Sequence, residues 1–197
     1  MNTIVLDKTE QGGYIPVSVM SKLASDRKLF IYGELDINKA ADICATLMFL
    51  SSQQATNDTI TLFVSINMAH IKAVLMVIDC IENISSKIKV VCIGALDGFG
   101  TLLLAAADKS KMTINSRLSF SPLKLMPNLH QTNTAESLMK RAFEYDKRVY
   151  SILSKKMGLS LKDTKKVFEK PVFWSSKDAL KHKLIDGIVS PKEEVIG

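Results

Sequence analysis

The sequence predicts an α/β protein built around a mainly parallel β-sheet. Runs of β-branched and aromatic residues alternate with segments of helical periodicity along the chain. One run, residues 88–94 (IKVVCIG), is apolar almost throughout, as expected for a strand covered on both faces of a sheet. No linker, repeat or low-complexity segment divides the 197 residues. We therefore expect a single domain over residues 1–197, long enough to bury one sizeable core.

The expected strands are short and follow polar or glycine-containing turns. They are residues 28–33, 59–66 and 88–94, two short extended segments within 111–121, and one segment near the end of the chain. Residues 1–13 are polar, end in two glycines, and are expected to be flexible unless another part of the protein holds them.

The expected helices follow capping residues or show apolar residues at spacings of three and four. They are residues 19–23, 37–53 after Asp36, 69–84, 98–107, 134–157, 160–169 with a Ser160 cap, and a capped helix within 175–190. The longest, 134–157, is polar over much of its surface. It carries one apolar stripe, made of Leu138, Ala142, Tyr145, Val149 and Ile152.

Composition and charge exclude several classes of function. The chain has 26 Lys and Arg against 20 Asp and Glu, a formal charge of +6. Because the lysines are spread over helix faces and accompany no recognition motif, we expect no nucleic-acid binding. The start of the chain lacks the basic and apolar regions of a secretory signal. No apolar run approaches the roughly 18 residues needed to cross a bilayer, so we expect no membrane partner.

No pattern indicates a metal or a cofactor. The three cysteines, Cys44, Cys80 and Cys92, lie in apolar periodic segments and are expected to be buried thiols in a reducing compartment. The three histidines, His70, His130 and His182, have neither metal-ligand spacing nor a partner at catalytic spacing. We therefore read them as structural or solvated.

Residues 90–108 (VVCIGALDGFGTLLLAAAD) combine a buried strand, a glycine-containing turn and the start of an apolar helix. Many hydrolases place a nucleophilic serine on such a turn. Here the turn carries Asp97, Gly98 and Phe99. A glycine leaves the turn free to use a positive φ, which a serine would enter only with strain.

The order of segments resembles the ClpP family, the serine peptidase of the Clp protease, over residues 4–189. The matching stretches are KLFIYGELD, TLFVS, VVCIGALDGFGTLLLAAADKSKMTINSRL and FWSSKDALKHKLIDGIV. The resemblance implies a ClpP/crotonase-like spiral of β-β-α units with a long protruding handle helix. It implies a flexible N-terminal axial segment over residues 1–18 and a handle region over 122–158.

The resemblance also assigns functional positions. The nucleophilic serine of the family corresponds to Gly98, the catalytic histidine to Ser121 and the catalytic aspartate to Pro171. The backbone donors to the oxyanion correspond to Met68 and Ala69. Since none of the first three side chains has the family's chemistry, the sequence predicts that the chain is no enzyme, of the non-catalytic ClpR type.

Residues 122–129 (PLKLMPNL) correspond to the strand on which the substrate peptide lies. The two prolines in this stretch remove backbone donors that pairing with a peptide would use.

The implied role is structural or regulatory, in the ring of an ATP-dependent protease complex. The implied partners are other copies in a heptameric ring, an active ClpP subunit, or both, and a Clp ATPase. The docking cleft for the ATPase corresponds to Thr61, Phe63, Ile93, Met112 and Ile114. The implied compartment is a plastid or apicoplast stroma, with a bacterial cytoplasm as the alternative.

Two other functions stay open. One is a hydrolase with a relocated site, in which Asp97 and His70 approach each other and Ser65 or Ser121 is the nucleophile. The other is a crotonase-like enzyme acting on acyl-CoA, which would need oxyanion donors in the same region.

Overall fold

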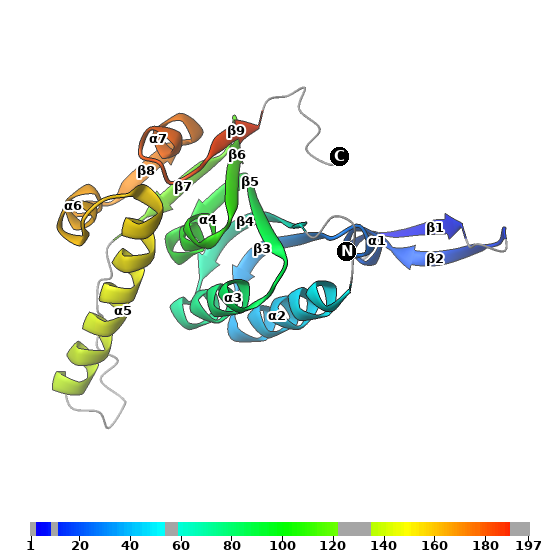
Figure 1. The fold of residues 1–197 in the computed structure, drawn as a ribbon, viewed down its shortest axis with the longest axis horizontal. Coiled ribbons are helices and arrows are strands. Elements are labelled where there is room, and N and C mark those ends of the chain that lie inside the picture. Colours follow the sequence, from blue (N-terminus) through cyan, green and yellow to red (C-terminus); the bar gives the residue numbers. More distant parts are fainter. Residues whose placement is uncertain (1–2, 9–11, 54–58, 122–134, 190–197) are drawn as a thin grey trace.

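The computed structural model describes residues 3–8, 12–53, 59–121 and 135–189, and these residues form the α/β fold that the sequence predicts (Figure 1). Five strands pair in parallel in the order β3-β4-β5-β6-β9. They are β3 (Lys28–Leu35), β4 (Thr59–Ala69), β5 (Lys87–Asp97), β6 (Lys109–Thr113) and β9 (Gly187–Val189). The parallel sheet and its helices have the architecture of a ClpP-like fold, so the predicted fold class is confirmed.

Strand β5 has two neighbours on the same side. Its first half pairs with β6, and its last residues pair in parallel with β7 (Arg117–Phe120). Strand β8 (Val172–Ser175) then pairs antiparallel with β7. The sequence analysis did not predict β8, because four residues that include an exposed Phe173 give little alternation to read.

The helices agree closely with the predicted ones. They are α1 (Val19–Ser25), α2 (Ile37–Ser52), α3 (Ile71–Asn83), α4 (Leu102–Ala106), α5 (Ala135–Met157), α6 (Leu161–Val167) and α7 (Ser176–Lys181), with a 3₁₀ turn, η1 (Gly98–Thr101), before α4. Side-chain caps set several starts. Asp36 accepts a hydrogen bond from the Lys39 N–H (2.8 Å), and Ser175 and Asp178 form a capping box.

Directly paired residues of parallel strands share a face, so the register divides the sheet into two surfaces. The inner face carries Ile31, Val64, Cys92 and Met112, which belong to the main core together with residues of α2, α3, α4 and α5. The outer face carries a small second cluster made only of strand residues: Phe63, Val91 and Val189, with Ile93 packed against them. Val91 on the outer face and Cys92 on the inner face are both buried, so the central part of β5 is covered on both faces, as expected.

Two segments extend from this body. Figure 1 shows a hairpin of β1 (Ile4–Lys8) and β2 (Tyr14–Ser18) on one side and the N-terminal part of α5 on the other. The hairpin replaces the polar leader expected at residues 1–13. In α5, Val149 and Ile152 lie in the main core. The apolar stripe of this helix therefore packs in part against its own subunit.

Asp186 joins three elements just before β9. Its Oδ2 accepts hydrogen bonds from the Ser110 N–H of β6 (2.7 Å) and the Ser110 hydroxyl (3.2 Å), and it pairs with Lys156 Nζ of α5 (2.8 Å). Burial acts to raise the pKa of this carboxyl, but Lys156 and the Ser110 donors outweigh burial and hold the pKa below its usual value. Ionised Asp186 therefore stabilises the junction of α5 with the sheet.

We predict that Asp186→Asn lowers the free energy of unfolding at neutral pH by about 1 kcal/mol, allowing for solvent screening of a partly exposed pair. The folded-state pKa lies below the unfolded value of about 3.9, so the stabilisation is complete above that value and is lost as pH falls through the folded pKa. Urea unfolding from pH 7 to pH 3 should show the difference shrinking below about pH 4.

Asp79→Asn is the matched control, because Asp79 is an exposed carboxylate 3.5 Å from Arg148. It should cost less than about 0.5 kcal/mol. A difference between Asp186→Asn and the unaltered protein that stays constant through acid pH would contradict the assignment.

Candidate functional site

Three strand ends meet at one corner of the sheet. Gly98 follows the last residue of β5, Ser121 follows the last residue of β7, and Pro171 precedes the first residue of β8. The pairing of Asp97 with Ser119, and of Phe120 with Val172, aligns these three ends. The topology therefore places the three positions that the sequence analysis selected in one region, although they are far apart in the chain.

The turn at this corner depends on the backbone conformation of Gly98. Gly98 has a φ of +55°, and a Cβ added there would meet nothing within 4 Å. The Thr101 hydroxyl donates to the Gly98 carbonyl (2.8 Å), which closes the 3₁₀ turn. The positive φ anticipated for this glycine is confirmed. A larger residue at this position would therefore lower the stability of the fold through backbone strain and not through steric crowding.

The polar groups at this corner are a carboxylate and a hydroxyl. Ser119 Oγ donates to Asp97 Oδ1 (2.6 Å) across the β5–β7 pair. Both residues line a cavity of about 560 Å³ together with Arg117, Phe173 and Asp178, among others. Phe173 is 81% exposed. The sequence analysis missed Ser119 because β7 is only four residues long and its pairing with β5 is not visible in the sequence.

The relocated hydrolase site is not assembled in this arrangement. His70 Nε2 lies 2.9 Å from Glu34 Oε1, and the His182 ring stacks on Trp174 with centroids 4.3 Å apart. Neither ring is bonded to a serine among the described residues. Ser65 lies against Gly94, where an added Cβ would come within 3.1 Å of its hydroxyl.

The two expected oxyanion positions continue a strand. Met68 and Ala69 are the last residues of β4 and pair with Glu34 and Leu35 of β3. His130 and the peptide-binding stretch 122–129 lie outside the described residues.

The positions expected to form an ATPase cleft divide between the two faces of the sheet. Phe63 lies in the outer cluster with Ile93 packed against it, and its ring stacks on Phe30 (centroids 4.9 Å). Thr61 lies on the same face of β4, two residues before Phe63. Ile114 follows the last residue of β6 and is 43% exposed. Met112 is fully buried in the main core on the inner face. A partner on the outer face would not reach it.

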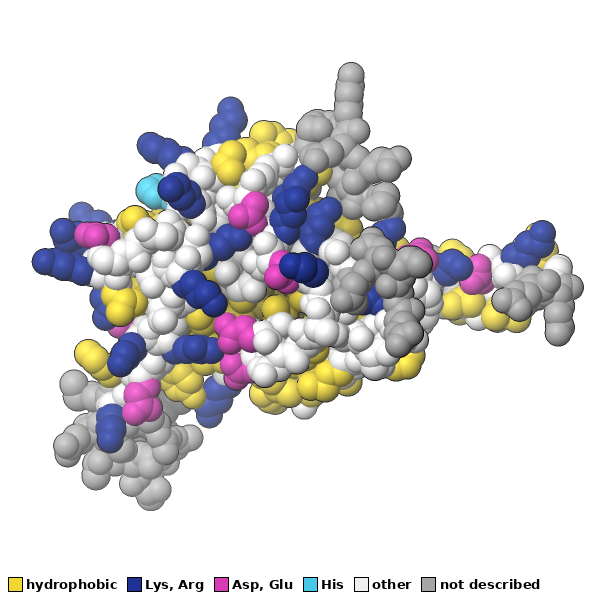
Figure 2. Space-filling view, in the orientation of Figure 1, with side chains coloured by type: hydrophobic (Ala, Val, Ile, Leu, Met, Phe, Trp, Pro, Cys, Tyr) yellow, Lys and Arg dark blue, Asp and Glu magenta, His cyan; other side chains and the backbone are white. Residues whose placement is uncertain are grey.

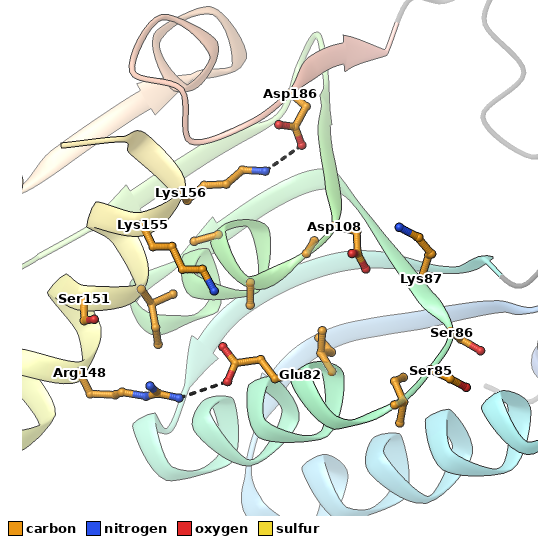
Figure 3. A pocket seen from close by; sticks show the side chains of 16 residues that line it. Glu82, Ser85, Ser86, Lys87, Asp108, Arg148, Ser151, Lys155, Lys156 and Asp186 are labelled. Carbon is orange, nitrogen blue, oxygen red and sulfur yellow. Dashed lines mark hydrogen bonds and ion pairs between the residues drawn. The ribbon is translucent and has the colours of Figure 1, made fainter.

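A second cavity, of about 680 Å³, lies between α3, α4 and α5 (Figure 3). Its charges are largely paired within the wall. Arg148 contacts Glu82 (3.4 Å) and Lys156 contacts Asp186 (2.8 Å), while Lys155 extends into the space. It shares no lining residue with the corner cavity, and we assign it to packing of α5 on the body.

Metal and thiol chemistry have little support at these sites. The described part of the chain contains no cluster of three His, Cys, Asp or Glu residues that could hold a metal. Burial raises the pKa of Cys44 to about 12 and that of Cys92 to about 11, so both thiols are protonated at neutral pH and are weak nucleophiles. All three cysteines are buried and free, as predicted.

Within the described residues, no helix has the length and apolarity of a membrane span.

We predict that Gly98→Ala destabilises the protein by about 1–2 kcal/mol, because alanine strains at positive φ. Gly98→Asn should cost less, since asparagine tolerates this region better. Gly187→Ala is the control, because its added Cβ would meet only the Lys111 stem at 3.8 Å. Thermal and urea unfolding measure all three. A Gly98→Ala protein as stable as the unaltered one would contradict the geometry of the turn.

Comparison with known proteins identifies the family. Residues 11–192 match the Clp protease family. The chain is 30% identical over 179 residues to the ATP-dependent Clp protease proteolytic subunit of Borreliella afzelii, covering 87% of each chain. It is 26% identical over 196 residues to the protein of the same name from Streptococcus uberis, covering 98% of this chain and 99% of that one.

These names correct one expectation. The sequence analysis predicted that the chain is no enzyme, yet the relatives are named proteolytic subunits, that is, peptidases. The prediction had rested on the residues at the triad positions Gly98, Ser121 and Pro171 and at the oxyanion positions Met68 and Ala69. The match along residues 11–192, together with the parallel sheet and its helices, shows that this chain belongs to the Clp protease family.

Proposed function

We propose that the chain is a ring-forming subunit of an ATP-dependent Clp protease, with the structural and regulatory role that the ClpR resemblance implies. This proposal concerns assembly and assigns no loss of peptidase activity. The observation that carries it is an open, apolar side of the subunit. Strand β3 is at the edge of the sheet, and Phe30 and Tyr32 on it are 40% and 57% exposed.

Helix α2, which follows β3, adds to this surface. Met48 and Phe49 are 58% and 61% exposed, and Figure 2 shows hydrophobic side chains gathered over the region of α2. Contiguous apolar area and an uncovered edge strand are features that association with another protein removes. Further copies of this chain in a heptameric ring, with or without an active ClpP subunit, are the partners that we propose.

A Clp ATPase is the second proposed partner. The relatives are named ATP-dependent subunits. A partly apolar outer face is available to a docking segment at Thr61, Ile93 and Ile114, while Phe63 and Met112 are left out because both side chains are buried. Three buried free thiols are compatible with a reducing compartment, for which we propose a plastid or apicoplast stroma.

We predict that the protein sediments as a particle larger than the 21.8 kDa chain, alone or with an active ClpP subunit. Phe49→Asp should shift the population toward the monomer, because a buried carboxylate at the contact is costly. Phe173→Asp is the control, since Phe173 is also an exposed phenylalanine (81%, against 61% for Phe49) but lies on β8. Sedimentation velocity at micromolar concentration measures both. A monomer under every condition would contradict ring formation.

Hydrolysis at the strand-end corner is a second candidate function. It is favoured by the 2.6 Å hydrogen bond from Ser119 to Asp97 beside a cavity of about 560 Å³. In this reading Ser119 Oγ is the nucleophile and the Asp97 carboxylate accepts its proton. This pair differs from the relocated site predicted from the sequence, which used His70.

We predict that a fluorophosphonate probe labels Ser119 of the native assembly and that Asp97→Asn lowers the labelling rate by about a hundredfold, a typical contribution of a general base. Ser121→Ala is the matched control and should leave the labelling unchanged. Mass spectrometry of the labelled peptide locates the adduct. Labelling that survives Ser119→Ala, or no labelling at all, would contradict this candidate.

A further inference from the structure

The outer face of the sheet carries a row of lysines where its strands begin. Lys28 of β3 pairs with Thr61, Lys89 of β5 pairs with both Thr61 and Lys109 of β6, and Lys87 pairs with Thr59. Because directly paired residues of parallel strands share a face, these lysines lie on the same surface. Lys111, two residues after Lys109, shares it too. In Figure 2, Lys and Arg side chains gather over the region of β5 and β6.

These side chains line a groove. A hollow of about 430 Å³ is bordered by Thr59, Ile88 and Asp108 and by four lysines, Lys87, Lys89, Lys109 and Lys111. The stem of Lys111 crosses Gly187, where the missing side chain leaves it room. Asp108 is the carboxylate among these lining residues, and its Oδ2 accepts a hydrogen bond from the Ile88 N–H (2.8 Å). The groove is therefore strongly positive.

The lysines repel one another. Neighbouring strands lie about 4.8 Å apart and alternate residues roughly 6.6 Å apart, so several ammonium groups are within one Debye length of each other. Like charges directly opposite one another on paired strands are unfavourable. Within the described part of the chain, Lys87, Lys89 and Lys109 have no ion pair. An anionic partner would relieve this repulsion.

The surroundings of the groove favour a peptide over other anions. The next row of the same face is apolar, with Phe30, Phe63 and Val91 in direct register before Lys111. Phe63 and Val91 are buried in this row and Phe30 is 40% exposed, so a segment lying across both rows would meet ammonium groups at one end and the Phe30 ring at the other. No glycine-rich phosphate cradle and no aromatic ladder among the lysines accompanies the charge.

We propose that this groove binds an acidic peptide segment of a partner protein, with its carboxylates on Lys87, Lys89, Lys109 and Lys111. The site is separate from the strand-end corner and from the α2 surface, and it adjoins the surface proposed for a Clp ATPase, because Thr61 lies in register between Lys28 and Lys89. It rests on the charges of the outer face, and ring formation can fail while it stands. Binding weakens with salt, because the ammonium groups are near the surface.

Fluorescence anisotropy of the full-length protein with a labelled octaglutamate peptide tests this proposal. The double variant Lys89→Glu/Lys109→Glu should bind the peptide at least about tenfold more weakly at low ionic strength. The matched control is Lys177→Glu/Lys181→Glu, which makes the same charge change on two exposed lysines of α7. It should bind within about twofold of the unaltered protein.

Two further measurements complete the test. Single Lys89→Glu places a carboxylate opposite Lys109, so its melting temperature should equal or exceed that of the unaltered protein, which separates lost binding from lost folding. Equal weakening in the strand and helix variants, or no octaglutamate binding at low salt, would overturn the proposal. So would tighter binding of an oligothymidylate that depends on the same lysines, because the groove would then be a nucleic-acid site.

Discussion

The alternation of side chains along five parallel strands is the constraint on which the rest of this structure depends. Each strand from β3 to β9 turns every second side chain toward the helices, and the register keeps Ile31, Val64, Cys92 and Met112 in one buried layer. A slip of one residue in β5 would turn its outer-face side chains, Lys89 among them, into the core, at a high cost for burying charge. The inner face therefore fixes the fold, and the outer face is the surface that we propose for binding.

The same register creates the strand-end corner. The β4–β5 pairing shifts its register between Val64 and Ile66 of β4, and the second half of β5 pairs with β7 and no longer with β6. Strand β7 in turn pairs with β8. Gly98, Ser119 and Phe173 meet there through pairings between segments far apart in the chain. Asp186 fastens the other side of the sheet to α5 through Lys156 and Ser110. The strand-end corner and the Asp186 junction thus lie in different parts of one sheet.

The predictable parts of the structure were those that local chemistry determines. Asp36, Ser160 and Ser175 cap the helices expected after them. The apolar content of the buried runs in β4 and β5 predicts both strands. The hairpin of β1 and β2 was missed because Ile4, Leu6 and Tyr14 are exposed and make no amphipathic pattern with a core. The pairing of Ser119 with Asp97, and the shared face of five lysines, depend on register and cannot be read from spacing alone.

The central claim is that the outer face of the sheet is a binding face in the working assembly. Lysine acetylation followed by mass spectrometry, carried out on the native complex and on the isolated chain, tests it most directly. The account predicts that Lys87, Lys89 and Lys109 react more slowly in the complex, while Lys177 and Lys181 of α7 react equally in both. Equal reactivity of all five lysines in the two samples would contradict it.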